Sequence, residues 1–275
     1  MNDKVIASHY QSGDLEQRLS AALRQDWADP LQPTIPELTP YDQFHGRGVE
    51  ATDELASKLD IQADHHLLDV GSGIGGPARY LADRFSCKVT GIDLTEEFCR
   101  LAQDLTKRVG LQDKVEFYIG DALHMPFADA SFDGAYSMNV SMNIADKSAL
   151  YREINRVLRP GGWLALSELA KGPGEDMTYP TPWAATAASS FLATPTETRR
   201  NLEQCGFAIE SFEDASEKVI AYGKKARQLV DQGQKPPHRA VQLIHGEGAP
   251  EAMKNTSRGV AENRIIPIEV ICRKT

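Results

Sequence analysis

The feature that most constrains the fold of this chain is a short apolar run that ends in a cluster of glycines. The run Leu67–Val70 includes one acid, Asp69, and Pro77 lies seven residues after Val70. Between them stand Gly71, Gly73, Gly75 and Gly76. Runs of this kind are typical of central parallel strands, and glycines allow the backbone to turn sharply. Pro suits the first turn of a helix, so the stretch predicts a strand, a tight turn and a helix start.

Strand-like and helix-like segments alternate after this turn, which predicts an α/β fold with a doubly wound, mostly parallel sheet. About fifty residues with helical patterning separate the last two strands, and we expect them to form a helical insertion at about 214–262. The expected strands are Leu67–Val70, Val89–Asp93, Val115–Ile119, Phe132–Met138, Trp163–Ser167, Phe207–Phe212 and Ile265–Cys272. The helix before the fifth of these strands is expected to end at Arg159–Gly162.

The part of the chain before the first strand is expected to form helices and a lid loop. Leu15–Asp26 and Val49–Leu59 have helical spacing. Four prolines between them predict an extended segment that cannot be a helix interior (Pro30, Pro33, Pro36 and Pro40). We therefore divide the chain into 1–60 (helices and lid loop), 61–170 (ligand-binding core) and 171–275 (the rest of the sheet with the insertion), within one structural domain.

The composition excludes several classes of protein. The net charge is −9 and no basic cluster appears, which argues against a nucleic-acid partner. The four cysteines form no C-x-x-C pair, so free thiols are expected and no metal site is predicted (Cys87, Cys99, Cys205 and Cys272). No apolar run is long enough to cross a bilayer and no signal peptide opens the chain, so a cytoplasmic protein is expected.

Acidic residues stand at the carboxyl ends of the expected strands, where open parallel sheets bind ligands. Asp93 lies about twenty residues after the glycines, the spacing at which a carboxylate accepts ribose hydroxyls. Asp121 follows Gly120 and could accept from an adenine amino group, with the Ala122 N–H donating to the ring. Each acid also has a simpler interpretation, Asp93 as a helix N-terminal acid and Asp121 as a turn residue.

The glycines alone also fit the fingerprint of a dinucleotide site, but Asp69 favours a cationic ligand over a pyrophosphate. With Asp93, Gly120–Ala122, Phe132–Asp133 and Leu158–Gly162 in the same order, the chain resembles the class I S-adenosylmethionine-dependent methyltransferases. The first motif is similar to that of the sarcosine/dimethylglycine, phosphoethanolamine and tocopherol enzymes. The resemblance implies a seven-stranded sheet with an antiparallel last strand, S-adenosylmethionine as cofactor and S-adenosylhomocysteine as product. A nicotinamide-dependent oxidoreductase and a non-catalytic cofactor-binding module remain alternatives.

The resemblance also implies a set of site residues. The cofactor is expected to contact Asp69, Gly71, Ser72, Gly73, Gly75, Asp93, Leu94, Gly120, Asp121, Ala122, Asn139, Gln43 and Tyr10. Catalytic roles are expected for Asn139, Asn143 and His45, although Asn143 could instead cap the next helix. Met142 and Trp183 are expected to line the acceptor pocket, and Tyr41 to belong to the lid.

The reaction that this site favours is methylation of a small-molecule acceptor, first of all N-methylation of a small amine. The arginine that an amino-acid carboxylate would need is missing from Asn139–Asp146, and neither Arg47 nor Arg79 is directed at the acceptor by its motif. C- or O-methylation of a quinone, tocopherol-like or isoprenoid molecule is therefore the alternative. The expected partner is a small molecule, not a nucleic acid or a membrane, and the chain is compatible with a homodimer.

Overall fold

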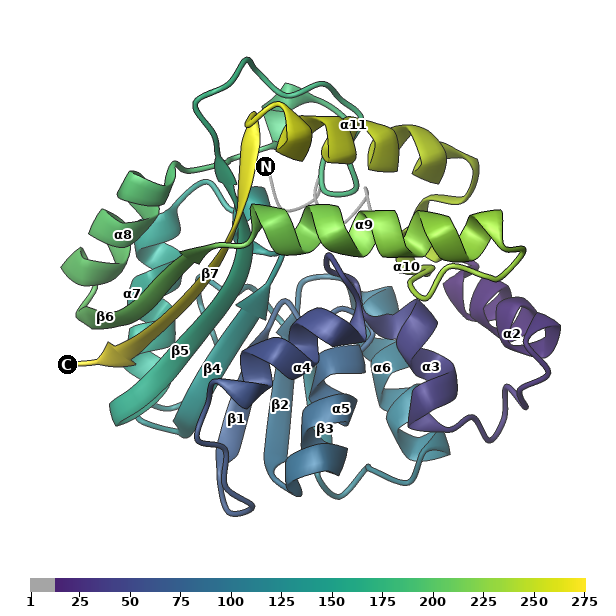
Figure 1. Ribbon diagram of the computed structural model, residues 1–275. Helices are drawn as coiled ribbons and strands as arrows, with labels where there is room; N and C mark the ends of the chain where they lie inside the picture. Colours follow the sequence, from purple (N-terminus) through teal and green to yellow (C-terminus); the bar gives the residue numbers. More distant parts are fainter. Residues whose placement is uncertain (1–12) are drawn as a thin grey trace.

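The computed structural model describes residues 13–275, and within them seven strands form one sheet (Figure 1). The strand order is β3-β2-β1-β4-β5-β7-β6. The first five strands run parallel, and β7 lies antiparallel between β5 and β6. The strands are β1 (His66–Val70), β2 (Lys88–Asp93), β3 (Val115–Ile119), β4 (Phe132–Met138), β5 (Leu158–Lys171), β6 (Phe207–Asp214) and β7 (Ile265–Lys274). The predicted seven-stranded, mostly parallel sheet with an antiparallel last strand is confirmed.

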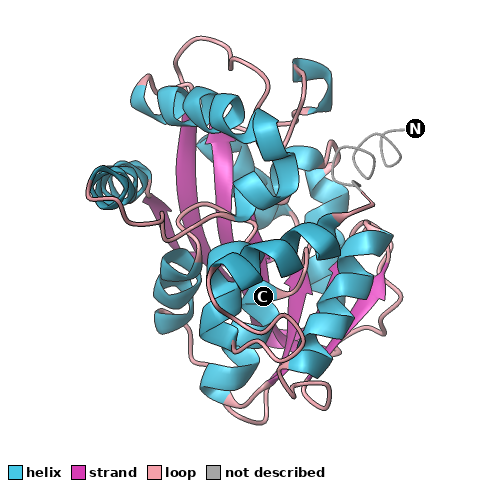
Figure 2. Cartoon of the chain, turned by 90° about the vertical axis from the view of Figure 1, so that its right-hand side faces the viewer, coloured by secondary structure: helices cyan, strands magenta, loops and turns pink. Residues whose placement is uncertain are grey.

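Helices cover both faces of this sheet (Figure 2). The helices are α2 (Leu15–Gln25), α3 (Ile35–Asp42), α4 (Val49–Ser57), α5 (Gly76–Phe85), α6 (Glu96–Arg108), α7 (Lys147–Val157), α8 (Pro195–Gln204), α9 (Ser216–Asp231), α10 (Ala240–His245) and α11 (Ala249–Ala261). The glycine-rich stretch forms the predicted strand, turn and helix, with Pro77 in the first turn of α5.

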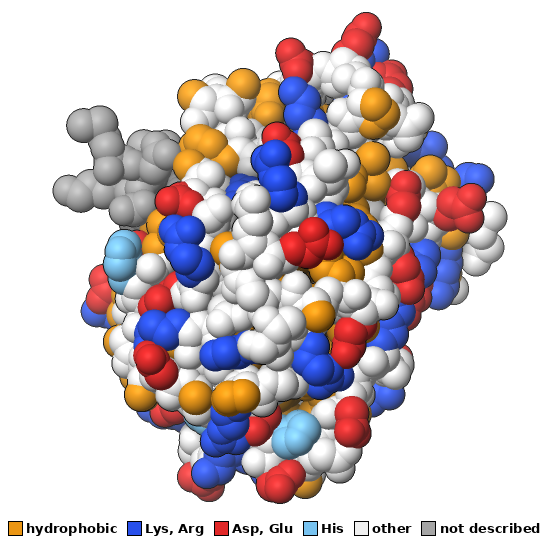
Figure 3. All heavy atoms as spheres, turned by 90° about the vertical axis from the view of Figure 1, so that its left-hand side faces the viewer, with side chains coloured by type: hydrophobic (Ala, Val, Ile, Leu, Met, Phe, Trp, Pro, Cys, Tyr) orange, Lys and Arg blue, Asp and Glu red, His pale blue; other side chains and the backbone are white. Residues whose placement is uncertain are grey.

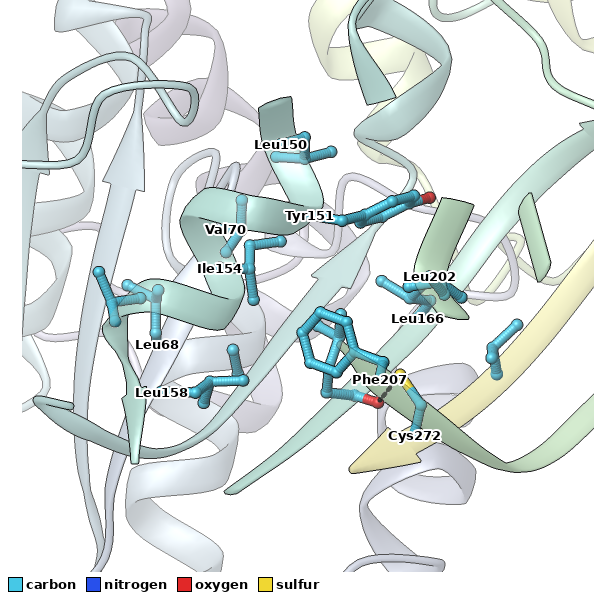
Figure 4. Close-up of a cluster of buried hydrophobic side chains, with 14 of the residues drawn as sticks. Leu68, Val70, Leu150, Tyr151, Ile154, Leu158, Leu166, Leu202, Phe207 and Cys272 are labelled. Carbon is cyan, nitrogen blue, oxygen red and sulfur yellow. Dashed lines mark hydrogen bonds between the residues drawn. The ribbon is translucent and has the colours of Figure 1, made fainter. Parts of the chain in front are cut away.

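Alternation of side chains along the buried strands produces one apolar core on each face. Leu68 and Val70 of β1 belong to the core cluster on the side of α7 and α8, in which Val70 lies beside Ile154 and Leu166 lies beside Leu202 (Figure 4). Leu67 points to the opposite side and packs with α4, α5 and α6. Because both faces of β1 are buried, the strand is held in the middle of the molecule and its carboxyl end cannot shift.

The prolines before the glycine turn do not prevent a helix, so that expectation was wrong. Residues Ile35–Asp42 form α3, which begins at a capping box between Thr34 and Glu37 and carries Pro36 in its first turn. Pro40 has no N–H to donate to the carbonyl of Pro36, and the hydroxyl of Thr39 donates to that oxygen instead, at 3.0 Å. A neighbouring side chain thus compensates for the internal proline.

The segment Arg159–Gly162 is part of β5 and not the end of the preceding helix. The strand begins at Leu158, which pairs with Phe132, and the register then shifts before Gly134 pairs with Trp163. Gly161 has a φ of +75°, which accommodates this bulge.

The insertion between β6 and β7 consists of α9, α10 and α11, and α9 and α11 lie across the carboxyl end of the sheet (Figure 1). The connection from α9 to α10 contacts the N-terminal region. The Arg239 N–H donates to the Pro40 carbonyl at 2.6 Å, and His238 Nε2 lies 2.7 Å from the Gln43 carbonyl oxygen. Tyr41 is buried, bonds Asp26 at 2.7 Å and stacks under Arg239. Tyr41 therefore packs the N-terminal segment against the insertion, and its place in a lid stays a prediction.

The surface carries charges of both signs. Figure 3 shows lysine and arginine side chains interspersed with acids on the side of the molecule that bears α8 and β6. In the part of the chain that the structure describes, no helix has both the length and the apolar character that crossing a membrane requires.

The close contact between Gly134 and the indole of Trp163 gives a test of the core. A Cβ at position 134 would lie 2.1 Å from the ring, whereas at Gly223 in α9 it would meet nothing within 4 Å. We expect Gly134→Ala to lower the free energy of unfolding by about 1–3 kcal/mol because the ring must move. Gly223→Ala should raise it by about 0.5–1 kcal/mol. Urea unfolding of both variants checks this, and equal effects would contradict the packing described.

Candidate functional site

A cavity of about 330 Å³ opens at the carboxyl ends of β1, β2, β3 and β4. The strand order reverses between β1 and β4, where an open α/β sheet forms its ligand crevice. The volume lies in the range of small-molecule sites. The strands β1, β2 and β4 contribute residues near their carboxyl ends, and the loops after all four strands contribute the rest, so the sheet itself brings together residues far apart in the sequence.

The glycine turn forms the floor of this cavity. The N–H groups of Gly71 and Ser72 both donate to the Ile92 carbonyl of β2, at 2.8 and 3.1 Å. Gly71 has a φ of +74°, and a Cβ there would lie 2.4 Å from Val140 in the loop after β4. The glycine is thus required by the turn and by the close approach of a second loop.

Asp93 joins the glycine turn to the start of α6. Its two carboxylate oxygens accept from the Gly73 N–H at 2.9 Å and the Thr95 N–H at 2.8 Å. Burial raises the pKa of Asp93, and these two N–H groups oppose the rise. Asp93 therefore acts as a local structural acid and also lines the cavity. Asp93 can therefore be a helix N-terminal acid and still bind ribose hydroxyls, because each carboxylate oxygen can accept more than one hydrogen bond.

Asp69 presents a carboxylate that lacks a complete set of partners. Asp69 is 2% exposed, lines the cavity, and its Oδ2 has no hydrogen bond within the described residues. Burial raises the pKa of Asp69 to about 8. The buried hydroxyl of Tyr136, which lies opposite Asp69 in the pairing of β1 with β4, also lacks a hydrogen bond to residues 13–275 and acts to lower the pKa of Asp69. A buried acid with an open acceptor position fits a ligand that brings a positive charge or an N–H donor.

The third acid, Asp121, lies at the end of β3. Its Oδ1 accepts from the Leu123 N–H at 2.8 Å, two residues further along the chain. This hydrogen bond is an Asx-turn, as expected for an aspartate in a turn. The side chain is about one-third exposed and lines the cavity beside Gly120 and Ala122. Asp69, Asp93 and Asp121 thus share one cavity.

A buried glutamate shapes the opposite wall, which is the loop after β4. Glu168 of β5 is 3% exposed. Its carboxylate accepts from the hydroxyls of Ser137 (2.8 Å) and Ser141 (3.0 Å) and from the N–H groups of Val140 and Ser141, both at 3.0 Å. Burial raises the pKa of Glu168 and these donors lower it. The loop is therefore fixed by one carboxylate with several donors.

Lys147, at the start of α7, holds the other end of the same loop. Its ammonium donates to the carbonyls of Ser141 at 2.5 Å, of Ile144, and of Phe191 at 2.6 Å. Burial lowers the pKa of Lys147 to about 8, and the charge of Glu168 opposes the change. Together Glu168 and Lys147 fix the 3₁₀ turn Ser141–Asn143 from both sides.

The two asparagines of this loop line the cavity. Asn139 has a φ of +59°, and its amide, oriented by its neighbours, donates to the Ser167 carbonyl and accepts from the Gly46 N–H. The Asn143 amide donates to the Trp183 carbonyl at 2.7 Å. Asn143 does not cap α7, because Asp146 accepts from the Ala149 N–H in that role. The alternative reading of Asn143 was therefore wrong.

His45 lines the cavity from the N-terminal side but is held in a buried polar group. Its Nε2 lies 3.2 Å from Gln43 Oε1 and 3.1 Å from the Thr52 hydroxyl, and Nδ1 lies 3.1 Å from the Gly46 carbonyl. Burial lowers the pKa of His45 to about 3. The imidazole is therefore neutral at physiological pH and a weak base.

Most of the expected site residues thus meet in one cavity. Gly75 and Gln43 do not line it: Gly75 turns the backbone beside Phe117, and Gln43 is fully buried behind His45. Met142 and Trp183 are also buried, in an apolar cluster with Val260, instead of lining an acceptor pocket. Tyr10 lies outside the described residues. The expected site residues that do line the cavity are Asp69, Gly71, Ser72, Gly73, Asp93, Leu94, Gly120, Asp121, Ala122, Asn139, Asn143 and His45.

Sequence reasoning missed two kinds of site residue. Phe44 and Phe98 line the cavity with an edge-to-face contact of 5.3 Å between their rings. Phe98 could have been found, because it lies on the first turn of the helix that follows Asp93. Glu168 directly follows the expected strand Trp163–Ser167, but its role depends on the pairing of β4 with β5. The role of Lys147 could not be predicted from the sequence, because an isolated lysine is ordinarily a surface residue.

The fold and this cavity place the chain among proteins with the Rossmann-like methyltransferase fold. Residues 68–166 match the family model described as a methyltransferase domain. This part of the chain is therefore a methyltransferase domain, and it contains the glycine turn, the three aspartates and the loop after β4.

Relatives and solved structures agree with that class. The chain is 34% identical to the methyltransferase GfsG of Streptomyces halstedii over 57% of each protein. It is 28% identical to the glycine/sarcosine/dimethylglycine N-methyltransferase of Actinopolyspora halophila, over 68% of this chain and 33% of the relative. The chain therefore spans less than two thirds of either relative. The geranyl diphosphate C-methyltransferase of Streptomyces coelicolor A3(2) superposes with a TM-score of 0.72 at 15% identity, covering 100% of this chain and 98% of that one.

The role of Glu168 can be tested by Glu168→Gln. The amide keeps one oxygen but places an NH₂ group against backbone N–H donors, so we expect the free energy of unfolding to fall by about 2 kcal/mol. Glu203→Gln, on the exposed side of α8, is the matched control and should change it by less than about 0.5 kcal/mol. Urea unfolding measures both variants. Equal stability of the two would show that the carboxylate does not hold the loop.

Proposed function

We propose that the protein is an S-adenosylmethionine-dependent methyltransferase that acts on a small molecule. The observation that carries the proposal is the convergence of Asp69, Asp93 and Asp121 on one cavity beside the glycine turn. A pyrophosphate would meet acidic groups and no cation among the described lining residues, whereas a nucleoside with a cationic amino-acid tail can ionise these groups and bind to them. The matched methyltransferase domain and the curated relatives support this activity.

The residues present fit this cofactor. Asp93 would accept the ribose hydroxyls, and Asp121 with the Ala122 N–H would bind the adenine edge. The unpaired oxygen of Asp69 would accept from the ammonium group. Phe44 and Phe98 supply an apolar wall beside these acids. The cavity therefore offers both the charge and the flat apolar surface that such a ligand needs.

When bound, S-adenosylmethionine supplies an electrophilic methyl group on its sulfonium. The protein has to align the acceptor with this methyl group and exclude water. Asn139 and Asn143, fixed through Glu168 and Lys147, would present amide groups to the acceptor. His45 would contribute as a hydrogen-bonding group and not as a base, because its pKa of about 3 leaves it a weak proton acceptor.

For the acceptor we propose the nitrogen of a small amine first. Acidic side chains around the cavity attract an amine, and amide oxygens can orient it before it loses its proton. The N-methyltransferase from Actinopolyspora halophila supports this reading. The second candidate is C- or O-methylation of an isoprenoid, quinone or tocopherol-like molecule, which the apolar side chains Met138, Val140 and Ile144 favour. The geranyl diphosphate C-methyltransferase structure shows only that this fold also occurs in a C-methyltransferase.

Calorimetry with the two competing cofactors tests the proposal. We expect S-adenosylmethionine to bind and NAD not to bind. Asp93→Ala should weaken the binding of S-adenosylmethionine by about 2 kcal/mol, or roughly thirty-fold, because it removes charge-assisted hydrogen bonds and releases the glycine turn. Asp129→Ala, whose acid lies on the exposed surface, is the control and should leave the affinity unchanged. Tight binding of NAD without S-adenosylmethionine would overturn the proposal.

The raised pKa of Asp69 predicts that cofactor binding releases a proton. At pH 7 an acid with a pKa of about 8 is mostly protonated, and a contacting ammonium favours the ionised form and lowers that pKa. We therefore expect close to one proton to be released on binding at pH 7, and none at pH 9. Calorimetry in buffers of different ionisation enthalpy measures the release. An Asp69→Asn variant that still releases the proton would assign it to another group.

A further inference from the structure

The charged side chains that line the cavity all carry one sign. Asp69, Asp93, Asp121 and Asp146 line it, and the described lining residues include no lysine or arginine. A bound S-adenosylmethionine would add one net positive charge, from a sulfonium, an ammonium and a carboxylate. One positive charge cannot balance the three acids that would surround the cofactor, and Asp146 adds a carboxylate beside Ala145 at the edge of the cavity. The acceptor therefore approaches a site that is acidic as a whole.

The buried cations near this site are already bound to other groups. Arg79 is fully buried and pairs with Asp42 at 2.9 Å. Arg47 pairs with Glu269 at 2.7 Å and with Glu54 at 2.9 Å. If Arg79 turned toward an acceptor, it would leave the buried Asp42 without its ion-pair partner, which is strongly unfavourable. Arg47 is held by two carboxylates, although Glu269 also pairs with Lys58 and Lys218 at 2.9 Å. The ammonium of Lys147 faces three carbonyl oxygens of the polypeptide.

The histidines on this side do not supply positive charge either. Burial lowers the pKa of His45 to about 3 and also lowers the pKa of His238, so both are neutral at physiological pH. A bridging metal would be another way to bind a phosphate. Across residues 13–275, no three His, Cys, Asp or Glu side chains are grouped so that they could hold a metal ion by themselves. Because a Mg²⁺ ion can bind a phosphate through one or two carboxylates, the binding test contains Mg²⁺.

Apolar side chains also line the cavity in and after β4. They are Met138, Val140, Ile144 and Ala145, with the two asparagines in the same stretch. An anionic group placed here would lose its hydration and gain only amide donors beside like charges. This combination disfavours anions by charge repulsion and by desolvation together.

We infer that the methyl acceptor carries no anionic group: it is an uncharged or cationic molecule with an apolar body. The inference rests on the proposed function and narrows it. Within the amine candidate it selects amines without a carboxylate or phosphate, and within the second candidate it selects alcohols, phenols or neutral rings. Amino-acid, phosphoester and diphosphate acceptors are excluded, even though relatives and structural neighbours are named for acceptors of these kinds.

Matched pairs of small molecules test this inference on the full chain. The protein is first saturated with S-adenosylhomocysteine, whose binding is followed by calorimetry, in buffer containing Mg²⁺. Ligand-detected NMR titrations then compare N,N-dimethylglycinamide with N,N-dimethylglycine, ethanolamine with phosphoethanolamine, and geraniol with geranyl diphosphate. The experiment reads binding, so it needs no turnover. Failure of S-adenosylhomocysteine to bind would count against the proposed function, separately from the inference on charge.

We expect the uncharged or cationic member of at least one pair to bind at least ten-fold more tightly than its anionic counterpart. No anionic member should bind as tightly as its partner. An anionic member that binds equally well or better in any pair would overturn the inference. Absence of binding by every member, with the cofactor product bound, would overturn the inference for amines and alcohols, the two acceptor classes that the pairs represent.

A positive charge introduced at the exposed edge of the cavity tests whether the missing cation is what disfavours anionic acceptors. Ala145 lines the cavity and is exposed, so a longer side chain can be accommodated there. Ala145→Arg should strengthen binding of the anionic members at least ten-fold, whereas Ala145→Gln, of similar length and without charge, should not. Equal behaviour of the two variants would show that charge at this edge does not determine the acceptor class.

Discussion

The hydrogen bonds of the buried Glu168 carboxylate determine the geometry of the whole cavity. The oxygens accept from two N–H groups and two hydroxyls, and all but the Ser137 hydroxyl belong to the loop after β4. That loop brings Val140 against Gly71 so closely that no side chain fits at the turn. The glycine turn in turn is tied to β2 through Asp93. Glu168, which does not itself line the cavity, thus positions both the loop after β4 and the glycine turn. A buried carboxylate needs such hydrogen-bond donors.

The site combines firmly paired charges with one that is left open. Arg79 with Asp42, and Arg47 with Glu269, are buried pairs that fix the N-terminal segment on the sheet. Asp69 differs, because it lines the cavity and its buried Oδ2 makes no hydrogen bond to the described residues. An incompletely paired acid costs stability in the free protein and can regain that cost when a cationic ligand binds. The contrast explains why the cavity can favour one ligand charge strongly without a cation of its own.

The sequence predicted the sheet well because its strands are short apolar runs separated by turn residues. The site could be predicted as far as strand ends define it, which is why Asp69, Asp93 and Asp121 meet as the spacing suggested. Glu168, Lys147 and Phe44 could not be assigned, since their roles depend on pairing between segments distant in the chain. The proline-containing α3 was missed for a local reason: Thr39 satisfies a carbonyl that a proline rule treats as unpaired. Gln43 was predicted to contact the cofactor because it is a polar loop residue, but packing buries it behind His45.

The anchoring of the N-terminal segment by the last insertion has a consequence for biosynthesis. Arg239 contacts Pro40 and Tyr41, and His238 contacts Gln43, across about two hundred intervening residues. During translation the sheet core can begin to pack while these partners are still missing, since domains form from the N-terminal side as the chain emerges. The side of the cavity that carries Phe44 and His45 is therefore completed only after the ribosome has released most of the polypeptide. A nascent chain stalled before Arg239 would have its glycine turn formed and its N-terminal wall unsecured.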